Sequence, residues 1–345
     1  MYADLEKAIL RNVKGLTSEQ LFYAMNIKGI VGCPKNIIKD FKALDCMDMF
    51  EQSPDEWGYG GIVKNRYETI QGFHSGSPVG SDKEKNTMEQ LQQHEFMRLE
   101  KEGKLAWITF TRKQKLNALN TAGTIQLLTI ARALREDPDV RVIIIRGEGR
   151  AFCTGIDLSE LADDRIEMDY HRRFEAALRL FETMEKLVIV GMHGYCLGGA
   201  LQLSLAADIR VSTTDCWIGL PAIKESLIPG LGTWRLPRYV GWGRAKKMVL
   251  GGQNIQGEEA VRIGLVDHIV PKEKFFTHLD QKAEKYLAAC STGNRMSKLL
   301  VNQAFDMDYD QVLSNYFKLQ ERAQFSLDAQ EAKRAYLAGE DPLWQ

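Results

Sequence analysis

The sequence predicts an α/β fold, because short apolar runs rich in β-branched residues alternate with segments of helical periodicity. The clearest run, "VRVIIIRG" at 140–147, is apolar without alternation, which is typical of a strand buried on both faces. Ahead of it, "LAWITF" predicts a strand and 121–137 predicts a helix. Strand, helix and strand in this order indicate a crossover unit with parallel strands.

The elements on either side extend this pattern. Residues 96–110 predict two strands joined by a turn at Gly103. "KLVIVGMHG" at 186–194 is a second buried strand, followed by a helix from Gly199 and a further strand, "IRVST", at 209–213. Beyond residue 240 the periodicity is mostly helical, in segments at 243–252, 257–264, 273–290 and 315–337.

Composition shifts divide the chain into four regions. Residues 1–71 predict a small, mainly helical extension of unknown role, with a Thr17…Gln20 capping box and apolar residues at helical spacing after Pro34. Residues 72–90 are rich in Gly, Ser and charge, which is typical of a linker. We expect the α/β core at 91–272 and a helical region at 273–345.

Composition also excludes several classes of function. The 345 residues carry a formal net charge of −1, so no overall field attracts nucleic acid or an anionic membrane. Six scattered cysteines without a C-x-x-C pair signal neither a zinc site nor a disulfide framework. No leader pattern is visible, and no run approaches the roughly 18 apolar residues of a membrane span. We expect a cytoplasmic protein.

Two glycine-containing turns stand at comparable places, each after a buried strand. They are "GRAFCTGIDL" at 149–158 and "GYCLGG" at 194–199. Each turn can expose a backbone N–H group, and two such donors aimed at one point form an oxyanion hole for a carbonyl oxygen. Neither turn fits a dinucleotide fingerprint or a phosphate-binding P-loop.

From about residue 95 to residue 345 the chain resembles the crotonase (enoyl-CoA hydratase/isomerase) superfamily. The resemblance runs in order through six segments: 112–120, 149–158, 193–211, 227–245, 257–271 and 325–344. It implies a ββα spiral core around two stacked sheets, with a helical C-terminal region that builds a homotrimer or a dimer of trimers. It also implies an acyl-CoA substrate and no cofactor beyond the coenzyme A moiety.

The resemblance assigns roles to particular residues. The amides of Ile156 and Gly199 correspond to the pair that grips the thioester oxygen. The segment Lys115, Leu116, Asn117 and Ala118 corresponds to the one that passes the adenine and pantetheine of coenzyme A.

Both glutamates of the family's hydratases are absent. Their positions hold Gln202, on the helix after the second turn, and Ala222, in "GLPAIKES". Hydration needs groups that move protons at water and at Cα, and losing one costs about 10²–10⁴-fold in rate. Ordinary hydration is therefore disfavoured. The nearest acid, Glu225, is either a relocated base or a solvent-facing residue.

The same departures resemble the cofactor-independent dioxygenases that act on 3,5-dihydroxyphenylacetyl-CoA. That branch has isoleucine at the position of Ile156, glutamine at that of Gln202, a "P-A-x-K-E" segment like 221–225 and an arginine like Arg173. Residues 1–90 do not match its N-terminal domain. This resemblance gives the most specific hypothesis, oxygenation of an arylacetyl-CoA enolate with O₂ as co-substrate.

Two other classes stay open. The chain is alternatively a non-standard hydratase or isomerase, a decarboxylase or an acyl-CoA hydrolase. It is otherwise a non-catalytic acyl-CoA-binding protein that has lost its acids. We expect structural roles for His193, Cys196, Asp157 and Asp208.

Overall fold

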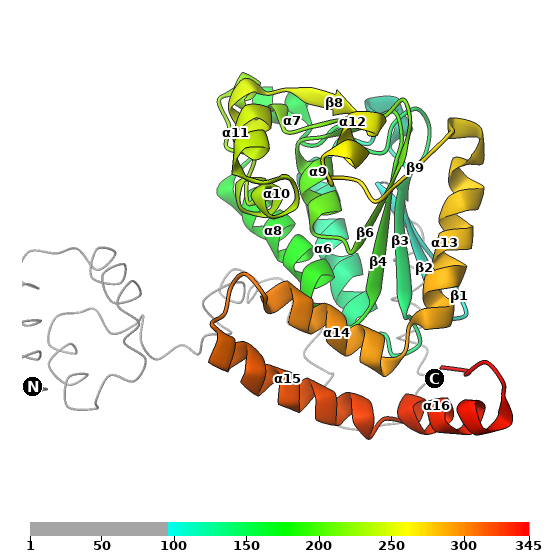
Figure 1. The fold of residues 1–345 in the computed structure, drawn as a ribbon. Helices are drawn as coiled ribbons and strands as arrows, with labels where there is room; N and C mark the ends of the chain where they lie inside the picture. Colours follow the sequence, from blue (N-terminus) through cyan, green and yellow to red (C-terminus); the bar gives the residue numbers. More distant parts are fainter. Residues whose placement is uncertain (1–95, 345) are drawn as a thin grey trace, which may run out of the picture. The chain divides into compact units, whose positions relative to one another are not determined.

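The structure is a computed structural model that describes residues 96–344. The expected N-terminal extension (1–71) and linker (72–90) lie outside the described residues. Two sheets and a series of helices make up the described part, which confirms the predicted α/β class (Figure 1).

The larger sheet has the strand order β1-β2-β3-β4-β6-β9. Its first two strands pair antiparallel across the turn at Gly103, whose φ of +55° suits glycine. All other neighbours in this sheet are parallel. The strands are β1 (Met97–Glu102), β2 (Leu105–Phe110), β3 (Val142–Gly147), β4 (Leu187–Met192), β6 (Ile209–Thr213) and β9 (His268–Val270).

Strand β3 shows why its sequence is continuously apolar. Ile143 and Ile145 pack into the main core, together with residues of helices α6 (Thr121–Glu136), α8 (Met168–Thr183) and α9 (Gly199–Leu205). Val142 and Ile144 pack into a second core with Phe275 and other residues of α13 (Phe275–Ala289). Figure 1 shows α13 on one face of the sheet and α6, α8 and α9 on the other. Alternate side chains therefore face two different apolar layers.

A small second sheet has the order β5-β7-β8, formed by Tyr195–Leu197, Trp217–Gly219 and Asn254–Gln256. Its strand β5 leads directly into α9, so it fixes the glycine turn between them. The remaining short elements are α7 (Leu158–Ala162), α10 (Gly232–Val240), α11 (Trp242–Gly251), α12 (Gly257–Arg262) and the 3₁₀ turns η2 (Lys113–Lys115), η3 (Pro221–Glu225) and η4 (Lys272–Lys274).

The last helical segment differs from the expectation of one run at 315–337. It divides into α15 (Tyr309–Gln324) and α16 (Leu327–Ala338), because Ser326 is an N-cap whose hydroxyl accepts a hydrogen bond from Ala329 N. Helix α14 (Thr292–Gln303) precedes them and contacts α8. None of the helices in residues 96–344 is long and apolar enough to cross a bilayer.

A buried ion pair attaches α14 to the core. Lys298 Nζ lies 2.8 Å from Asp208 Oδ2 and also donates to the carbonyls of Phe181 and Lys186. Asp208 in turn accepts from Val188 N at 2.7 Å, at the start of β4. Asp208 is thus a structural anchor, as the sequence predicted.

Substituting Lys298→Met should therefore destabilise the protein by about 3–5 kcal/mol, because it leaves the Asp208 carboxylate buried without its cation. Urea unfolding at neutral pH measures this. Lys318→Met, at an exposed position on α15, is the matched control and should change stability little. Equal effects of the two substitutions would contradict the anchoring role.

Candidate active site

A cavity of about 510 Å³ lies where several parts of the chain meet. Its walls come from the loop ahead of α7, from the first half of α8, from the turn between β5 and α9, and from η3 with the loop that follows it. Apolar side chains, including Phe174 and Leu227, form much of the lining.

The two glycine turns predicted to converge lie side by side at this cavity. Cys153 and Cys196 form a parallel bridge, and Leu197 N donates to Cys153 O at 3.2 Å. Gly155, with φ of +87°, approaches so closely that a Cβ there would lie 2.9 Å from Gly199 N. Only glycine allows this contact between the two backbones.

The amides of Ile156 and Gly199 are both available at the cavity. The bridge between Leu119 and Ile156 uses the N–H groups of Leu119 and Asp157, so the N–H of Ile156 points to the opposite side. Gly199 is the first residue of α9, where an N–H has no acceptor within the helix. Both residues line the cavity, and two such donors can hold one anionic oxygen.

The segment 115–118 divides between lining and support. Lys115 and Ala118 line the cavity. Leu116 accepts a hydrogen bond from Thr154 N, and the buried Asn117 side chain donates to three carbonyls, those of Glu148, Ala151 and Phe152. Leu116 and Asn117 therefore hold the loop that carries Ile156, rather than line the cavity themselves.

Gln202, Ala222 and Glu225 all line the cavity, whereas Arg173 is not among the lining residues. The cavity therefore has an amide and a methyl group at the two positions where the family's hydratases have acids. Glu225 is half-buried at the end of η3, so the sequence-based choice of this residue as a nearby acid agrees with its position.

Two titratable residues of the cavity, His171 and Glu175, were missed from the sequence. They lie four residues apart on α8, beside the inward-facing Tyr170 and Phe174. This i, i+4 spacing next to apolar positions was a signal that could have identified them, had 168–183 been predicted as a helix.

Burial lowers the pKa of His171 from its ordinary value of 6.5, and the charge of Glu175 offsets this only in part. The imidazole is therefore neutral at pH 7 and can accept a proton. Among residues 96–344, burial and the charge of Glu175 are the influences on its pKa, and no hydrogen bond contributes. Its ring contacts that of Tyr170, with the centroids 5.3 Å apart.

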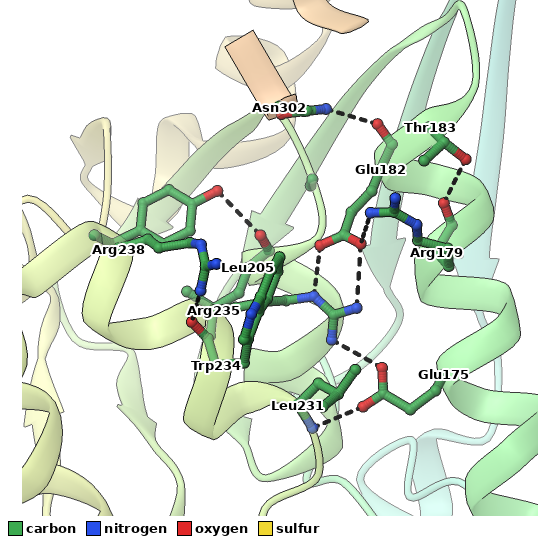
Figure 2. A network of polar contacts seen from close by, with 12 residues as sticks. Glu175, Arg179, Glu182, Thr183, Leu205, Leu231, Trp234, Arg235, Arg238 and Asn302 are labelled. Atoms are coloured by element: carbon green, nitrogen blue, oxygen red, sulfur yellow. Dashed lines mark hydrogen bonds and ion pairs between the residues drawn. The ribbon is translucent and has the colours of Figure 1, made fainter. Parts of the chain in front are cut away.

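In contrast to His171, both carboxylate oxygens of Glu175 have hydrogen-bond or ion-pair partners. Its Oε1 accepts from Leu231 N at 2.9 Å, and its Oε2 lies 2.9 Å from Nη1 of the buried Arg235. Figure 2 shows that Arg235 is also bound by Glu182, so that one guanidinium lies between two carboxylates from α8. The carboxylate of Glu175 therefore serves as an ion-pair partner of Arg235 and is not free to act as a base.

The remaining candidates have structural partners. Asp157 caps α7 through Ser159 N and pairs with Arg112 at 2.5 Å. His193 lies outside the cavity lining, against Phe275 and Gly149 O. Burial raises the pKa of the Cys196 thiol well above its ordinary value, so it is unreactive. Residues 96–344 contain no cluster of three or more His, Cys, Asp or Glu side chains that could hold a metal ion.

The pair of Arg112 and Asp157 should make stability depend on acid. Burial alone would raise the pKa of Asp157, but hydrogen bonds from Ser159 and Arg112 outweigh it and lower the pKa to about 2. The stabilisation is thus present above the ordinary value of 3.8 and is lost as pH falls through about 2. Arg112→Gln should cost about 1–3 kcal/mol at pH 7.

Urea unfolding of the wild type and of Arg112→Gln, measured between pH 7 and pH 2, tests this. The difference between the two proteins should shrink as pH falls below about 4, because the carboxyl group is then protonated in the unfolded state. A difference that stays constant down to pH 2 would contradict the assignment.

Comparisons with known proteins agree with this geometry. The family described as "Enoyl-CoA hydratase/isomerase" matches residues 100–345. The chain is 33% identical over 223 residues to the short-chain-enoyl-CoA hydratase of Clostridium acetobutylicum, covering 63% of this chain and 84% of that protein. It is 34% identical over 227 residues to the crotonyl-CoA hydratase of Syntrophomonas wolfei, covering 64% and 86%.

Among solved structures, the enoyl-CoA hydratase of Bacillus anthracis superposes with a TM-score of 0.68 at 27% identity, covering 72% of this chain and 99% of that chain. The fold expected from the resemblance, a crotonase-like core with C-terminal helices, is thereby confirmed. The chain belongs to the enoyl-CoA hydratase/isomerase (crotonase) superfamily, whose members act on acyl-CoA thioesters.

Proposed function

We propose that this protein is a non-standard enoyl-CoA hydratase or isomerase, which moves a proton through an enolate held by the amides of Ile156 and Gly199. The observation that carries the proposal is the presence of a neutral imidazole, His171, in the same cavity as these two amides. The hydratases among its relatives support the reaction class.

The two amides supply the electrostatic part of catalysis. When water adds to Cβ of an enoyl thioester, the electron pair of the Cα=Cβ bond moves onto the thioester oxygen. Two N–H donors fixed in advance stabilise that charge without reorganising as it develops. Lys115 and Ala118, which also line the cavity, are proposed to contact the coenzyme A moiety.

His171 is the best placed of the cavity's titratable groups to move the proton. Glu175 is occupied by Arg235 and Leu231, and Asp157 by Arg112 and Ser159. Burial raises the pKa of Tyr170, whose hydroxyl donates to Leu119 O, so Tyr170 stays protonated. His171 is in the base form at neutral pH because burial lowers its pKa.

Glu225 is proposed as the second group. It lies on the same 3₁₀ turn as Ala222, and no ion pair engages it within residues 96–344. Its carboxylate accepts a hydrogen bond that orients the water molecule. His171 takes the proton as the oxygen bonds to Cβ and returns it to Cα, so the cycle consumes and releases no net proton.

Oxygenation of an arylacetyl-CoA is not part of this proposal. Ile156, Gln202 and Ala222 line the cavity, but Arg173 is not among the lining residues, and the relatives named above are hydratases. O₂ as a co-substrate therefore has no support from the site or from the relatives. The homotrimer or dimer of trimers implied by the resemblance stays a prediction.

His171→Gln should lower kcat/KM for hydration of short enoyl-CoAs by about 10²–10⁴-fold, because it removes the proton acceptor. Loss of the enoyl thioester's ultraviolet absorbance measures the rate. In the wild type kcat/KM should fall on the acid side with an apparent pKa below the ordinary 6.5, and this limb should disappear in the variant.

Arg172→Gln is the matched control, because Arg172 is the next residue on α8 and is exposed. It should keep the wild-type rate and pH profile. A His171→Gln protein within threefold of the wild type would refute the proposed role. An active site that binds acyl-CoA but exchanges no Cα proton in deuterated water would instead indicate a non-catalytic binder.

Gly155→Ala should lower kcat by about 10²–10³-fold, the cost of losing one donor to the oxyanion. Its Cβ would lie 2.7 Å from Leu197 O and 2.9 Å from Gly199 N, so the two turns must separate. Gly103→Ala is the control, since Gly103 also has a positive φ but no atom within 4 Å of its Cβ position. Equal losses of kcat in both variants would contradict the role of the contact.

A further inference from the structure

The side-chain amide of Gln202 has one orientation that satisfies its neighbours. In that orientation Nε2 donates to Pro229 O at 3.2 Å and to Glu175 Oε1 at 3.3 Å. Both amide hydrogens are then used. The side chain is 8% exposed and lines the cavity, so its oxygen is the polar atom left for a ligand.

Glu175 can impose this orientation because it is itself fixed. Arg235 is 2% exposed and binds Glu175 Oε2 at 2.9 Å and Glu182 at 2.5 and 3.2 Å. Burial opposes the charge of Arg235, but the hydrogen bonds and charges of the two glutamates outweigh it and raise its pKa. Figure 2 shows Glu175 reaching from α8 to both Arg235 and Leu231.

The same contact explains why position 202 holds an amide. A glutamate there would place its carboxylate against Glu175 Oε1, where the amide nitrogen now lies at 3.3 Å. Two carboxylates at hydrogen-bond distance cannot both ionise without a large cost, so one would keep a proton. A charged carboxylate at 202 is therefore disfavoured beside the charged Glu175, whereas an amide fits without changing its protonation.

We propose that Glu175, anchored by Arg235, is a positioning residue that fixes Gln202 as a hydrogen-bond acceptor facing the substrate. Gln202 Oε1 then accepts a hydrogen bond from the hydroxyl of a bound 3-hydroxyacyl-CoA, beside the thioester. The site accordingly selects thioesters that carry a hydroxyl group near the carbonyl. This inference rests on the proposed function and specifies the substrate class for it.

Equilibrium binding of 3-hydroxybutyryl-CoA and butyryl-CoA tests the inference without using turnover. The wild type should prefer the hydroxy thioester by about tenfold, as expected for one well-placed hydrogen bond. Glu175→Gln should abolish the preference for the hydroxy thioester, because the single oxygen of the new amide then accepts from the charged Arg235. The NH₂ group of the new amide then faces Leu231 N and Gln202, which both donate to Glu175 Oε1 in the wild type, so Gln202 turns its own NH₂ toward the cavity.

Glu182→Gln is the matched control. Glu182 binds the same guanidinium and loses the same charge, but no contact with Gln202 is present in residues 96–344. It should keep the tenfold preference even where it lowers the melting temperature. Loss of the preference in both variants would show that the effect runs through the packing of Arg235, and would overturn the role of Glu175.

A second variant keeps the test valid if Glu175→Gln does not fold. In Gln202→Glu the new carboxyl group should have a pKa raised by Glu175, so its stabilising protonated form is present at low pH and is lost as pH rises. The melting temperature should fall relative to the wild type between pH 5 and pH 8. A difference that does not change with pH would contradict the contact between 175 and 202.

The two proposals fail in different ways. A wild type that prefers the hydroxy thioester but hydrates no enoyl-CoA keeps the role of Glu175 and removes the proposed reaction. A wild type that hydrates enoyl-CoAs without this preference keeps the reaction and removes the role of Glu175.

Discussion

The site depends on one close contact between two stretches of backbone. The loop that carries Ile156 and the turn that carries Gly199 are joined through parallel bridging, and Gly155 has no side chain to separate them. The first stretch follows β3 of the larger sheet and the second follows β5 of the smaller sheet, so the two sheets set where the amides lie. Because the donors belong to the main chain, they persist whatever side chains surround them. Substitution around this pair can thus change the reaction while leaving the proposed oxyanion hole in place.

The charges of the cavity are arranged differently from those expected of a family hydratase. Acids are missing at 202 and 222, yet a carboxylate from α8 reaches the same place and is bound by Arg235. We propose that this carboxylate orients Gln202, and that the imidazole of His171, one turn earlier on α8, transfers the proton. We propose that His171, Glu225 and the Gln202 amide together supply the proton transfer and hydrogen bonding that two glutamates provide in the family's hydratases.

Many of the strands and helices could be predicted from hydrophobic pattern and glycine turns, whereas the arrangement of two sheets followed from the family resemblance. The uninterrupted run at 142–145 reflects two apolar layers, and the turn at Gly103 reflects a positive φ. The closeness of the two glycine turns could be predicted because each follows a strand, whereas the donor roles of Ile156 and Gly199 stay a proposal that comes from the family resemblance. The division of the last helical run at Ser326 was missed, although a serine N-cap marks it.

The role of Glu175 could not be predicted in the same way, because it comes from contacts that are remote in sequence. Glu175 meets Leu231 and Arg235 more than 50 residues away. The residues around "HRRFE" give no sign of those partners. The sequence therefore favoured the adjacent Arg173 as the functional residue. Likewise, Leu116 and Asn117 belong to the predicted coenzyme A segment, but their hydrogen bonds to the loop at 148–154 give them a supporting role.

The central claim is that the amides of Ile156 and Gly199 polarise a thioester carbonyl. The most direct measurement is the carbonyl stretching frequency of butyryl-CoA labelled with ¹³C at the thioester carbon, recorded free and bound by difference infrared spectroscopy. Two hydrogen bonds to the oxygen should shift the band of the bound ligand to lower frequency. A bound ligand whose carbonyl band is unchanged from that in water, or shifted to higher frequency, would contradict the account.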